Sequence, residues 1–305
     1  MFYFWVLFNI FALGLLLLDL RIHRRGRTVR FREALIWSAG YVALAAVFAV
    51  LLYFWQGEQV ALEFVTGYVV EVSLSVDNLF VFFVIFQYFA VPEQQQHRVL
   101  FWGVIGALIL RGIFIGAGVG LISHFHWVLY IFGALLIFSG IRLAVSGDRK
   151  VDPAANPVVR ALRYFVPVTD GYRDGKFFIH NLQENSRLYA TPLFVVLLVV
   201  ETTDVLFAVD SIPAVLAITL NAFVVYTANV FAILGLRSMY FAISRLMKLF
   251  RFLHYGLAAM LMLVGLKMLL AEYYRIPTTA MLGLVAAVIL ISIAISVVFP
   301  IPSKG

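Results

Sequence analysis

Five acidic residues stand inside two long apolar stretches of the chain. They are Glu71 and Asp77 in the run 62–90, and Glu201, Asp204 and Asp210 in the run 192–219. A charged carboxylate at membrane depth costs roughly 2.5–3.5 kcal/mol on insertion scales, so five of them would cost about 15 kcal/mol against lipid. We therefore expect all five carboxylates to face the interior of the protein and to meet cations there.

Polar side chains next to these acids widen the set of oxygen ligands. Asn78 follows Asp77, and Ser211 follows Asp210. Carboxylate, amide, hydroxyl and carbonyl oxygens together suit hard cations such as Mn²⁺, Mg²⁺ or Ca²⁺. The chain contains no cysteine, which excludes a thiolate metal site and a cysteine nucleophile. A carboxylate in a low dielectric also takes up a proton readily when its metal leaves, so proton antiport is the expected coupling.

Four basic residues fall inside other apolar stretches and are the expected counter-charges for the acids. They are Arg111, Arg142, Arg237 and Lys267. Against five carboxylates, four positive charges leave a small negative surplus that would attract a cation. We interpret these basic residues as structural counter-charges or gates and not as ligands.

The spacing of the paired acids decides whether both can face one site on a straight helix. Residues six apart on an ideal helix are turned by about 240° and do not share a face. Pro213 lies three residues after Asp210 and removes a backbone hydrogen bond near residue 209. We therefore predict a broken or unwound segment there, where Thr202, Thr203 and Ser211 could satisfy the freed backbone groups.

The acidic motif occurs twice in the chain. Residues 71–78 and 204–211 both read acid, five residues, acid and then a small amide or hydroxyl residue. Two later pairs follow in the same order, 110–112 with 236–238 and 140–142 with 265–267. A shift of three membrane spans means that the two units cross the membrane in opposite directions. Such inverted repeats are typical of secondary transporters, whose sites lie near the midplane at the repeat interface.

Composition places these elements in a membrane. Of the 305 residues 63% are hydrophobic and only 13% are charged, and the mean hydropathy is +0.99. Nine apolar runs are long enough to cross the hydrocarbon core: 2–20, 34–55, 62–90, 99–122, 125–145, 192–219, 223–243, 253–271 and 279–299. The first run is followed by a basic stretch in place of a cleavage site, so we expect it to be retained. The sequence thus predicts an all-α polytopic membrane protein.

One transporter domain is expected over residues 1–305. The predicted repeat units are 62–145 and 192–271, and a linker at 146–191 with prolines, glycines and charges of both signs joins them. Most of the 23 Lys and Arg residues fall in connections that share one face if the N-terminus is outside. The positive-inside rule then predicts an outside N-terminus, a cytoplasmic linker and a cytoplasmic C-terminus in a bacterial-type inner membrane.

The basic balance of the chain, with a pI of 9.7, is explained by this topology. We expect the lipid bilayer to be a partner, with anionic headgroups near the basic connections, and we expect no nucleic-acid partner. Residue types leave the oligomeric state open.

Several motifs together carry a family resemblance. They are Glu71-x-x-Leu74-Ser75-x-Asp77-Asn78, Thr191-Pro192-Leu193, Glu201-x-x-Asp204-x-x-Phe207-Ala208-x-Asp210-Ser211-Ile212-Pro213-Ala214, the segment Asn229 to Phe241, and Gly265-Leu-Lys267-Met268. With them the chain resembles the TerC family of integral membrane proteins, and within it the Alx-type manganese exporters. The resemblance implies a fold related to the LysE-type exporters, with two inverted three-helix units, and export of Mn²⁺ from the cytoplasm.

The same resemblance implies the residues of the transport site. They are Glu71, Asp77, Asn78, Asp204, Asp210 and Ser211, with Glu201 as a close neighbour. The metal would be transported cargo, and no permanently bound cofactor is expected. Family members are also named for tellurium resistance, which these residues do not explain.

Two other classes of function compete with a transporter. An intramembrane enzyme with an acidic pair would be expected to carry Gly-x-Gly-Asp or His-Glu-x-x-His, and the chain has neither. We therefore expect no enzyme. A non-transporting scaffold or assembly factor is the second alternative, and it would not require the buried acids.

Overall fold

Long apolar helices make up most of the computed structural model. It describes residues 2–22, 31–125, 127–146, 167–169, 171–173, 175–181, 187–246, 253–270 and 277–298. The helices are α1 (Phe2–Ile22), α2 (Phe31–Gln56), α3 (Glu58–Tyr88), α4 (Glu93–His124), α5 (Val128–Ser146), α7 (Pro192–Leu216), α8 (Ala222–Leu246), α9 (Leu253–Leu269) and α10 (Thr278–Val298). Each of the nine predicted runs coincides with one helix of the described part of the chain, so the predicted all-α class is confirmed.

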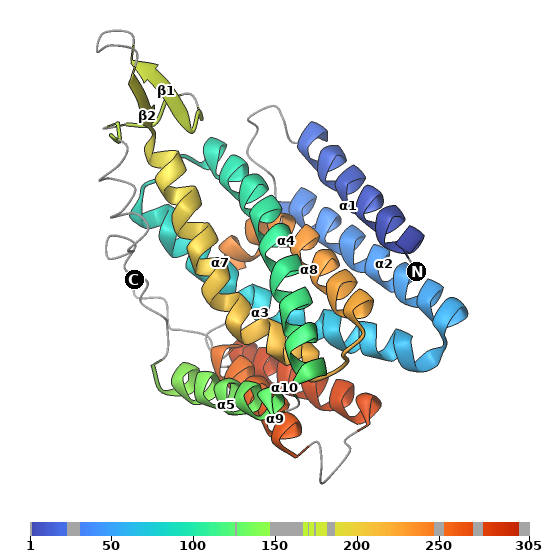
Figure 1. Ribbon diagram of the computed structural model, residues 1–305. Coiled ribbons are helices and arrows are strands. Elements are labelled where there is room, and N and C mark those ends of the chain that lie inside the picture. The colour runs from blue at the N-terminus through green and yellow to red at the C-terminus, as the bar shows by residue number, and fades with distance from the viewer. Residues whose placement is uncertain are drawn as a thin grey trace.

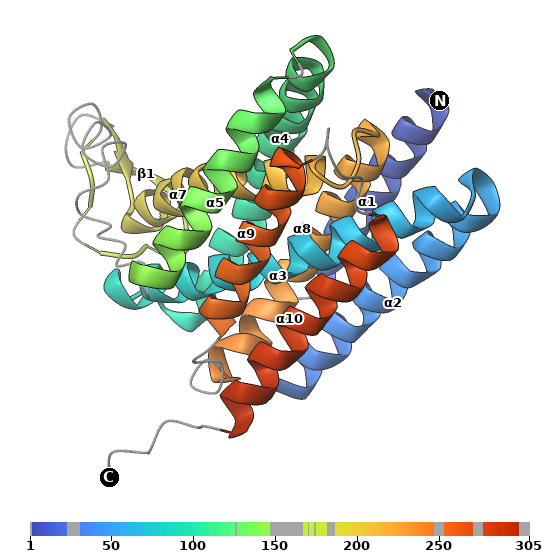
Figure 2. The ribbon, with the colours of Figure 1, turned by 90° about the horizontal axis from the view of Figure 1, so that it is seen from below.

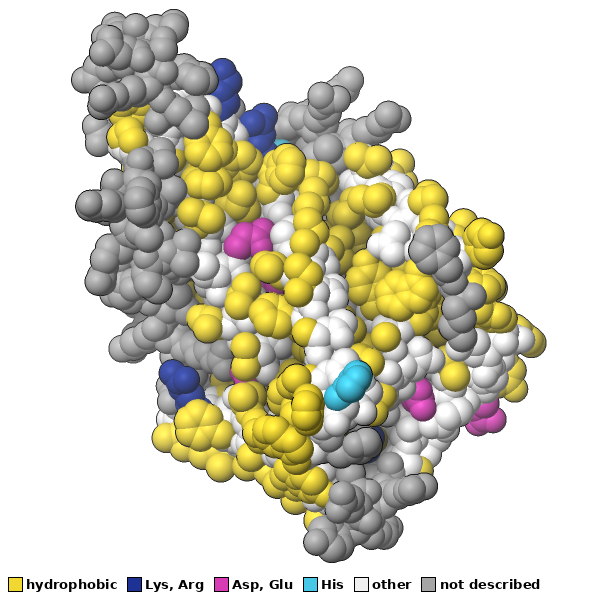
Figure 3. Space-filling view, viewed as in Figure 1, with side chains coloured by type: hydrophobic (Ala, Val, Ile, Leu, Met, Phe, Trp, Pro, Cys, Tyr) yellow, Lys and Arg dark blue, Asp and Glu magenta, His cyan; other side chains and the backbone are white. Residues whose placement is uncertain are grey.

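Most of these helices have the length and composition of membrane spans. Seven of the described helices are long and apolar enough to cross a membrane, namely α2, α3, α4, α5, α7, α8 and α10. Helices α1 and α9 carry shorter apolar stretches, Tyr3–Leu18 and Tyr255–Leu269. Many large hydrophobic side chains are exposed, and Figure 3 shows a mostly hydrophobic described surface in one view. This surface fits lipid, because soluble monomers rarely expose large continuous apolar patches.

The helices of the two predicted repeat units are interleaved in space. Helix α3 packs against α8, α4 packs against α7, and α5 packs against α9 (Figure 1 and Figure 2). If α3 is exchanged with α7, α4 with α8 and α5 with α9, the same three contacts result. Around this centre, α2 lies against α3 and α8, α10 lies against α9 and α3, and α1 packs on α8. These contacts fit two corresponding three-helix units, and the inverted orientation of the units stays a prediction.

The contact between α5 and α9 follows the same exchange residue by residue. A Cβ on Gly265 would lie 2.6 Å from the carbonyl oxygen of Gly133, and a Cβ on Gly140 would lie 2.8 Å from that of Ala258. The sequence repeat aligns 140 with 265 and therefore 133 with 258, so each contact is the image of the other. Missing side chains allow the two backbones to approach closely, as small residues do between membrane helices.

The predicted break at Pro213 is wrong, because α7 is a continuous helix from Pro192 to Leu216. The proline costs one backbone hydrogen bond but leaves the next turn intact, where the amide of Ala217 donates to the carbonyl of Pro213 at 2.9 Å. The hydroxyls expected to satisfy freed groups bond elsewhere. Thr203 donates back to the carbonyl of Val199 at 2.6 Å within its own helix.

Part of the predicted linker folds against the helix ends. Strands β1 (Phe178–Asn181) and β2 (Arg187–Ala190) form an antiparallel pair, which the sequence did not predict. The hydroxyl of Tyr172 donates to the carbonyl of Phe89 at 2.6 Å, and Arg98 donates to the carbonyl of Gly175 at 2.8 Å. These bonds attach the chain before α7 to the turn between α3 and α4 and to the N-terminal part of α4. Residues 147–166, 170, 174 and 182–186 of the predicted linker lie outside the described residues.

Candidate functional site

Arg111 lies at the centre of a buried polar cluster. It projects from α4, and its side chain is 1% exposed. Its Nη1 donates to Oε1 of Glu71 on α3. Its Nε and Nη2 donate to Oδ2 and Oδ1 of Asp204 on α7, at 3.4 and 3.2 Å. The guanidinium therefore joins one acid from each predicted repeat unit.

Two neutral oxygens complete the shell around this guanidinium. Nη1 of Arg111 also donates to Oγ of Ser211 at 3.2 Å and to Oδ1 of Asn229 on α8 at 2.9 Å. Both partners are 1% exposed. Hydrogen bonds from an ionised donor are stronger than neutral ones, especially where water is excluded. The cluster therefore fastens α3, α4, α7 and α8 to one another.

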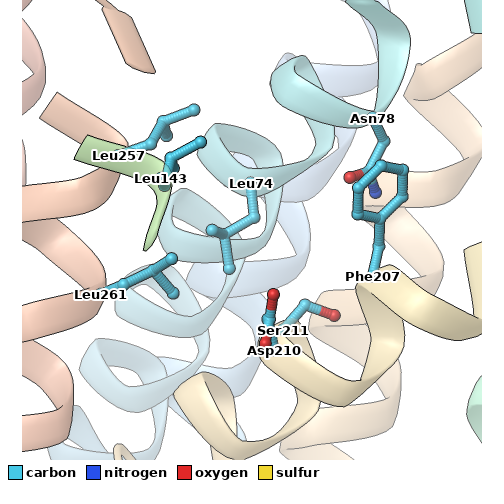
Figure 4. A pocket seen from close by; sticks show the side chains of 8 residues that line it. All are labelled: Leu74, Asn78, Leu143, Phe207, Asp210, Ser211, Leu257 and Leu261. Carbon is cyan, nitrogen blue, oxygen red and sulfur yellow. The ribbon is translucent and has the colours of Figure 1, made fainter. Parts of the chain in front are cut away.

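Asp210 belongs to a second polar group further along α7. Its Oδ1 accepts a hydrogen bond from the hydroxyl of Ser139 on α5 at 2.7 Å. Asp210, Ser211 and Asn78 line a small cavity whose other walls are apolar side chains of α3, α5, α7 and α9. Figure 4 shows Asp210 and Ser211 on α7 across from Asn78 on α3. Ser211 is thus shared between this cavity and the guanidinium shell.

The predicted ligands therefore do not form one group in this structure. Because α7 stays helical between Asp204 and Asp210, the turn of about 240° directs the two carboxylates to different sides. No three His, Cys, Asp or Glu side chains of the described residues lie close enough together to hold a metal ion. Asp77 lies on α3, but its side chain falls outside the described part of the structure.

Glu201 lies one turn before Asp204 and is half-buried. Its carboxylate packs against α4 at Gly106, where a Cβ would collide with both carboxylate oxygens. Oε2 of Glu201 has no hydrogen-bond partner within the residues that the structure describes. The sequence repeat aligns Glu201 with Tyr68, so this acid has no acidic counterpart in the first unit.

The predicted counter-charges take different positions. Arg111 forms the ion pairs described above. Arg237 of α8 is buried and, together with Asp204, lines a second small cavity among α3, α4, α7 and α8. Lys267 of α9 is half-buried and interacts electrostatically with Glu63 of α3. Arg142 is exposed, which differs from its predicted inward position, because it lies away from the side of α5 that meets α9, α7 and α4.

Two residues of the site were not predicted from the sequence. Asn229 binds the guanidinium of Arg111, and Ser139 binds the carboxylate of Asp210. The available signal was weak but real: each is a polar residue inside an apolar run, where a side chain needs an internal partner. Neither belongs to the duplicated acidic motif.

The fold and its buried clusters define a polytopic α-helical membrane protein with carboxylates at the contact of its two central helices, α3 and α7. The oxygens gathered there can compensate and hold cationic groups, as they do for Arg111. Residues 56–303 match the model of the Integral membrane protein TerC family, and the chain belongs to this family.

Relatives cover almost the whole chain. An "Uncharacterized membrane protein STKORF319" of Myxococcus xanthus is 43% identical over 295 residues, which cover 96% of this chain and 92% of that protein. A protein of Escherichia coli (strain K12) named "Putative membrane-bound redox modulator Alx" is 42% identical over 302 residues, covering 96% of this chain and 93% of the relative. A relative of the same name from Salmonella typhi is 43% identical, with the same coverage of both chains. No solved structure matches the chain.

Proposed function

We propose that this protein is a secondary transporter that exports a divalent metal cation, with Mn²⁺ as the expected cargo. The observation that carries the proposal is the convergence of Glu71 and Asp204 on one buried position. These acids come from corresponding places in the two predicted repeat units, and both are buried. Carboxylates are expensive in a membrane interior, so a pair retained there marks a binding site or an ion pathway.

The position of this pair matches what alternating access needs. Helices α3 and α7 lie against each other at the centre of the bundle, and each packs on a helix of the other unit. A site at the repeat interface can be exposed to either side when one unit rocks against the other. Asn78, Ser211 and Asp210 add amide, hydroxyl and carboxylate oxygens beside it, which suit a hard divalent ion. Asp77 and Glu201 remain proposed members of the site.

The metal-free geometry implies that the ligands must rearrange. Glu71 and Asp204 are held by Arg111, while Asp210 is held by Ser139. A bound metal ion would draw Asp210 toward Glu71 and Asp204, with Ser211 between them because it borders both groups. Proton antiport is the proposed coupling, since a proton can replace the ion on a carboxylate. Mn²⁺ and the outward direction rest on the resemblance to the Alx-type manganese exporters.

We place the protein in the inner membrane, with the N-terminus outside and the C-terminus in the cytoplasm. Strands β1 and β2 of the linker and the start of α4 would then lie on the cytoplasmic side. The relatives from Escherichia coli and Salmonella typhi are named putative redox modulators, but this chain has no cysteine, so thiol–disulfide exchange by its own residues is excluded. Variants of the buried acids distinguish a scaffold from a transporter. A scaffold would keep its cellular effect when these acids are neutralised, whereas a transporter would lose its ion flux.

Transport is tested by reconstituting the purified protein into proteoliposomes that contain a Mn²⁺-sensitive dye and a pH indicator. We expect Mn²⁺ flux with counter-movement of protons, strongly reduced in Asp210→Asn and in Glu71→Gln. Mg²⁺ and Ca²⁺ are run in parallel to rank the cargo. Glu93→Gln is the matched control, since Glu93 is exposed at the start of α4. Equal flux in the wild type and both acid variants would reject the proposal.

A cellular measurement tests the direction of transport. Cells that express the wild type under manganese stress should hold less intracellular manganese than cells that express Asp210→Asn. A matching manganese content in the two strains would contradict export.

A further inference from the structure

The guanidinium of Arg111 occupies a shell that has the make-up of a cation site. Five oxygen atoms of four residues surround it: both carboxylate oxygens of Asp204 and one oxygen each from Glu71, Ser211 and Asn229. Three of these oxygens converge on Nη1, which has only two hydrogens to donate. Carboxylate, hydroxyl and amide oxygens are also the ligands that hard divalent ions take. The shell therefore suits a small cation at least as well as an arginine.

Further polar atoms near this shell lack partners. Oε2 of Glu71, Oγ of Ser75 and Nδ2 of Asn78 are buried and have no hydrogen-bond partner among the described residues. Their residues are 0%, 1% and 3% exposed. They follow one another at helical spacing along one stripe of α3. Because buried polar groups without partners are costly, this stripe indicates that a ligand binds between the shell and the adjoining cavity.

Charge decides which ions can replace the guanidinium. Glu71 and Asp204 with Arg111 carry one net negative charge. A divalent ion neutralises both carboxylates and interacts with each twice as strongly as a monovalent ion at equal distance. A monovalent ion brings no more charge than the arginine already supplies, and it breaks the arginine's hydrogen bonds. Ser211, which the guanidinium contacts, also lines the cavity that contains Asp210, so a displaced guanidinium would shift in that direction.

We propose that Arg111 is a tethered cation that fills the Glu71–Asp204 site of the metal-free protein, excludes monovalent cations from it, and is displaced by the divalent cargo. This inference rests on the proposed function, because it assumes that a divalent ion binds here. It assigns Arg111 a role in selecting ions by charge, beyond balancing the acids. Asn229 then serves as a positioning residue for the guanidinium.

The test measures Mn²⁺ binding to the purified full-length protein by calorimetry, in K⁺ buffer and in choline buffer of equal ionic strength. Choline is too large for the site, so it serves as the reference. We expect wild-type affinity to be the same in both buffers. In Arg111→Gln, K⁺ should enter the vacated shell and weaken Mn²⁺ binding by about tenfold or more relative to choline. Arg111→Lys keeps a tethered charge and should stay insensitive to K⁺.

A second readout needs no Mn²⁺. K⁺ should raise the unfolding temperature of Arg111→Gln over that in choline, and it should leave the wild type unchanged. If Arg111→Gln does not fold, the double variant Glu71→Gln with Arg111→Gln replaces it, because it keeps the net charge of the cluster. Arg173→Gln, at an exposed linker position, controls for loss of a positive charge.

The outcomes separate this inference from the proposed function. If the wild type binds Mn²⁺ but Arg111→Gln, or the double variant that replaces it, is as insensitive to K⁺ as the wild type, the role of Arg111 in selecting ions by charge is overturned and transport stands. If K⁺ already competes in the wild type, the role is likewise overturned. If the wild type binds no divalent ion, the proposed function fails and this inference fails with it.

Discussion

Replacing Arg111 by glutamine should be among the most destabilising single changes in the protein, and a compensating change should recover part of the loss. The guanidinium is 1% exposed and balances Glu71 and Asp204, whose side chains are 0% and 5% exposed. Breaking a buried ion pair by removing one partner typically costs about 3–5 kcal/mol, because the remaining charge is uncompensated. Here two carboxylates would be left facing each other. We therefore expect a loss at the upper end of that range.

Removing one acid has a different consequence. Glu71→Gln leaves Arg111 and Asp204 as a one-to-one pair that keeps its two hydrogen bonds. Its cost should be about 1–3 kcal/mol, which corresponds to one lost hydrogen bond to a charged group. The double variant should then be more stable than Arg111→Gln alone, with a coupling energy of about 1–3 kcal/mol.

Reversible unfolding in mixed micelles, titrated with a denaturing detergent without divalent ions, gives these free energies. The cycle needs the wild type, both single variants and the double variant. Strict additivity of the two single changes would refute the reasoning, because it would mean that Arg111 and Glu71 do not interact. A small loss for Arg111→Gln alone, below about 1 kcal/mol, would show that its environment is not dry.

Three further predictions concern other parts of the molecule. Gly133→Ala should cost about 1–3 kcal/mol of unfolding free energy through the close approach to α9, while Gly116→Ala, with open space around it, should stay within about 0.5 kcal/mol in the same assay. Ser139→Ala should strengthen Mn²⁺ binding by up to about tenfold, because Asp210 no longer has to break its hydrogen bond to Ser139 before it joins the cargo. Ser123→Ala, at an exposed position, should not change the affinity in calorimetry. Burial raises the pKa of Tyr172 from 10.0 to about 12, so its neutral hydroxyl supports the docked linker below about pH 10 and loses that hydrogen bond as the pH rises through about 12. Limited proteolysis of the linker should accelerate over that window in the wild type and be fast at every pH in Tyr172→Phe; equal rates at neutral pH would contradict the docking role.

The sequence alone determined the membrane class, through its composition, and the positions of the helices, through its apolar runs. Apolar runs report burial in lipid directly, since a span needs length and low charge and little else. For the same reason the acids at 71 and 204 are assigned to the interior by their residue type and their apolar neighbours alone. Their buried positions agree with that expectation. The duplicated motif likewise indicated which helices correspond, and the contacts of α3, α4 and α5 with their counterparts fit it.

Tertiary structure decided which side chains meet. From spacing, a bend at Pro213 was expected to bring Asp204 and Asp210 together, but packing on both sides keeps α7 helical, so the two acids point to separate groups. Spacing also gave no sign that Arg111, of the first unit, would bind an acid of each unit. Partner choice depends on how α3, α4, α7 and α8 cross. That crossing is set by close contacts between helices, such as those of Gly67 with Val215 and of Gly103 with Val200, and not by the pattern along one helix. The sequence thus determined that the charges are buried, and the crossing of the helices determined that Arg111 lies between Glu71 and Asp204.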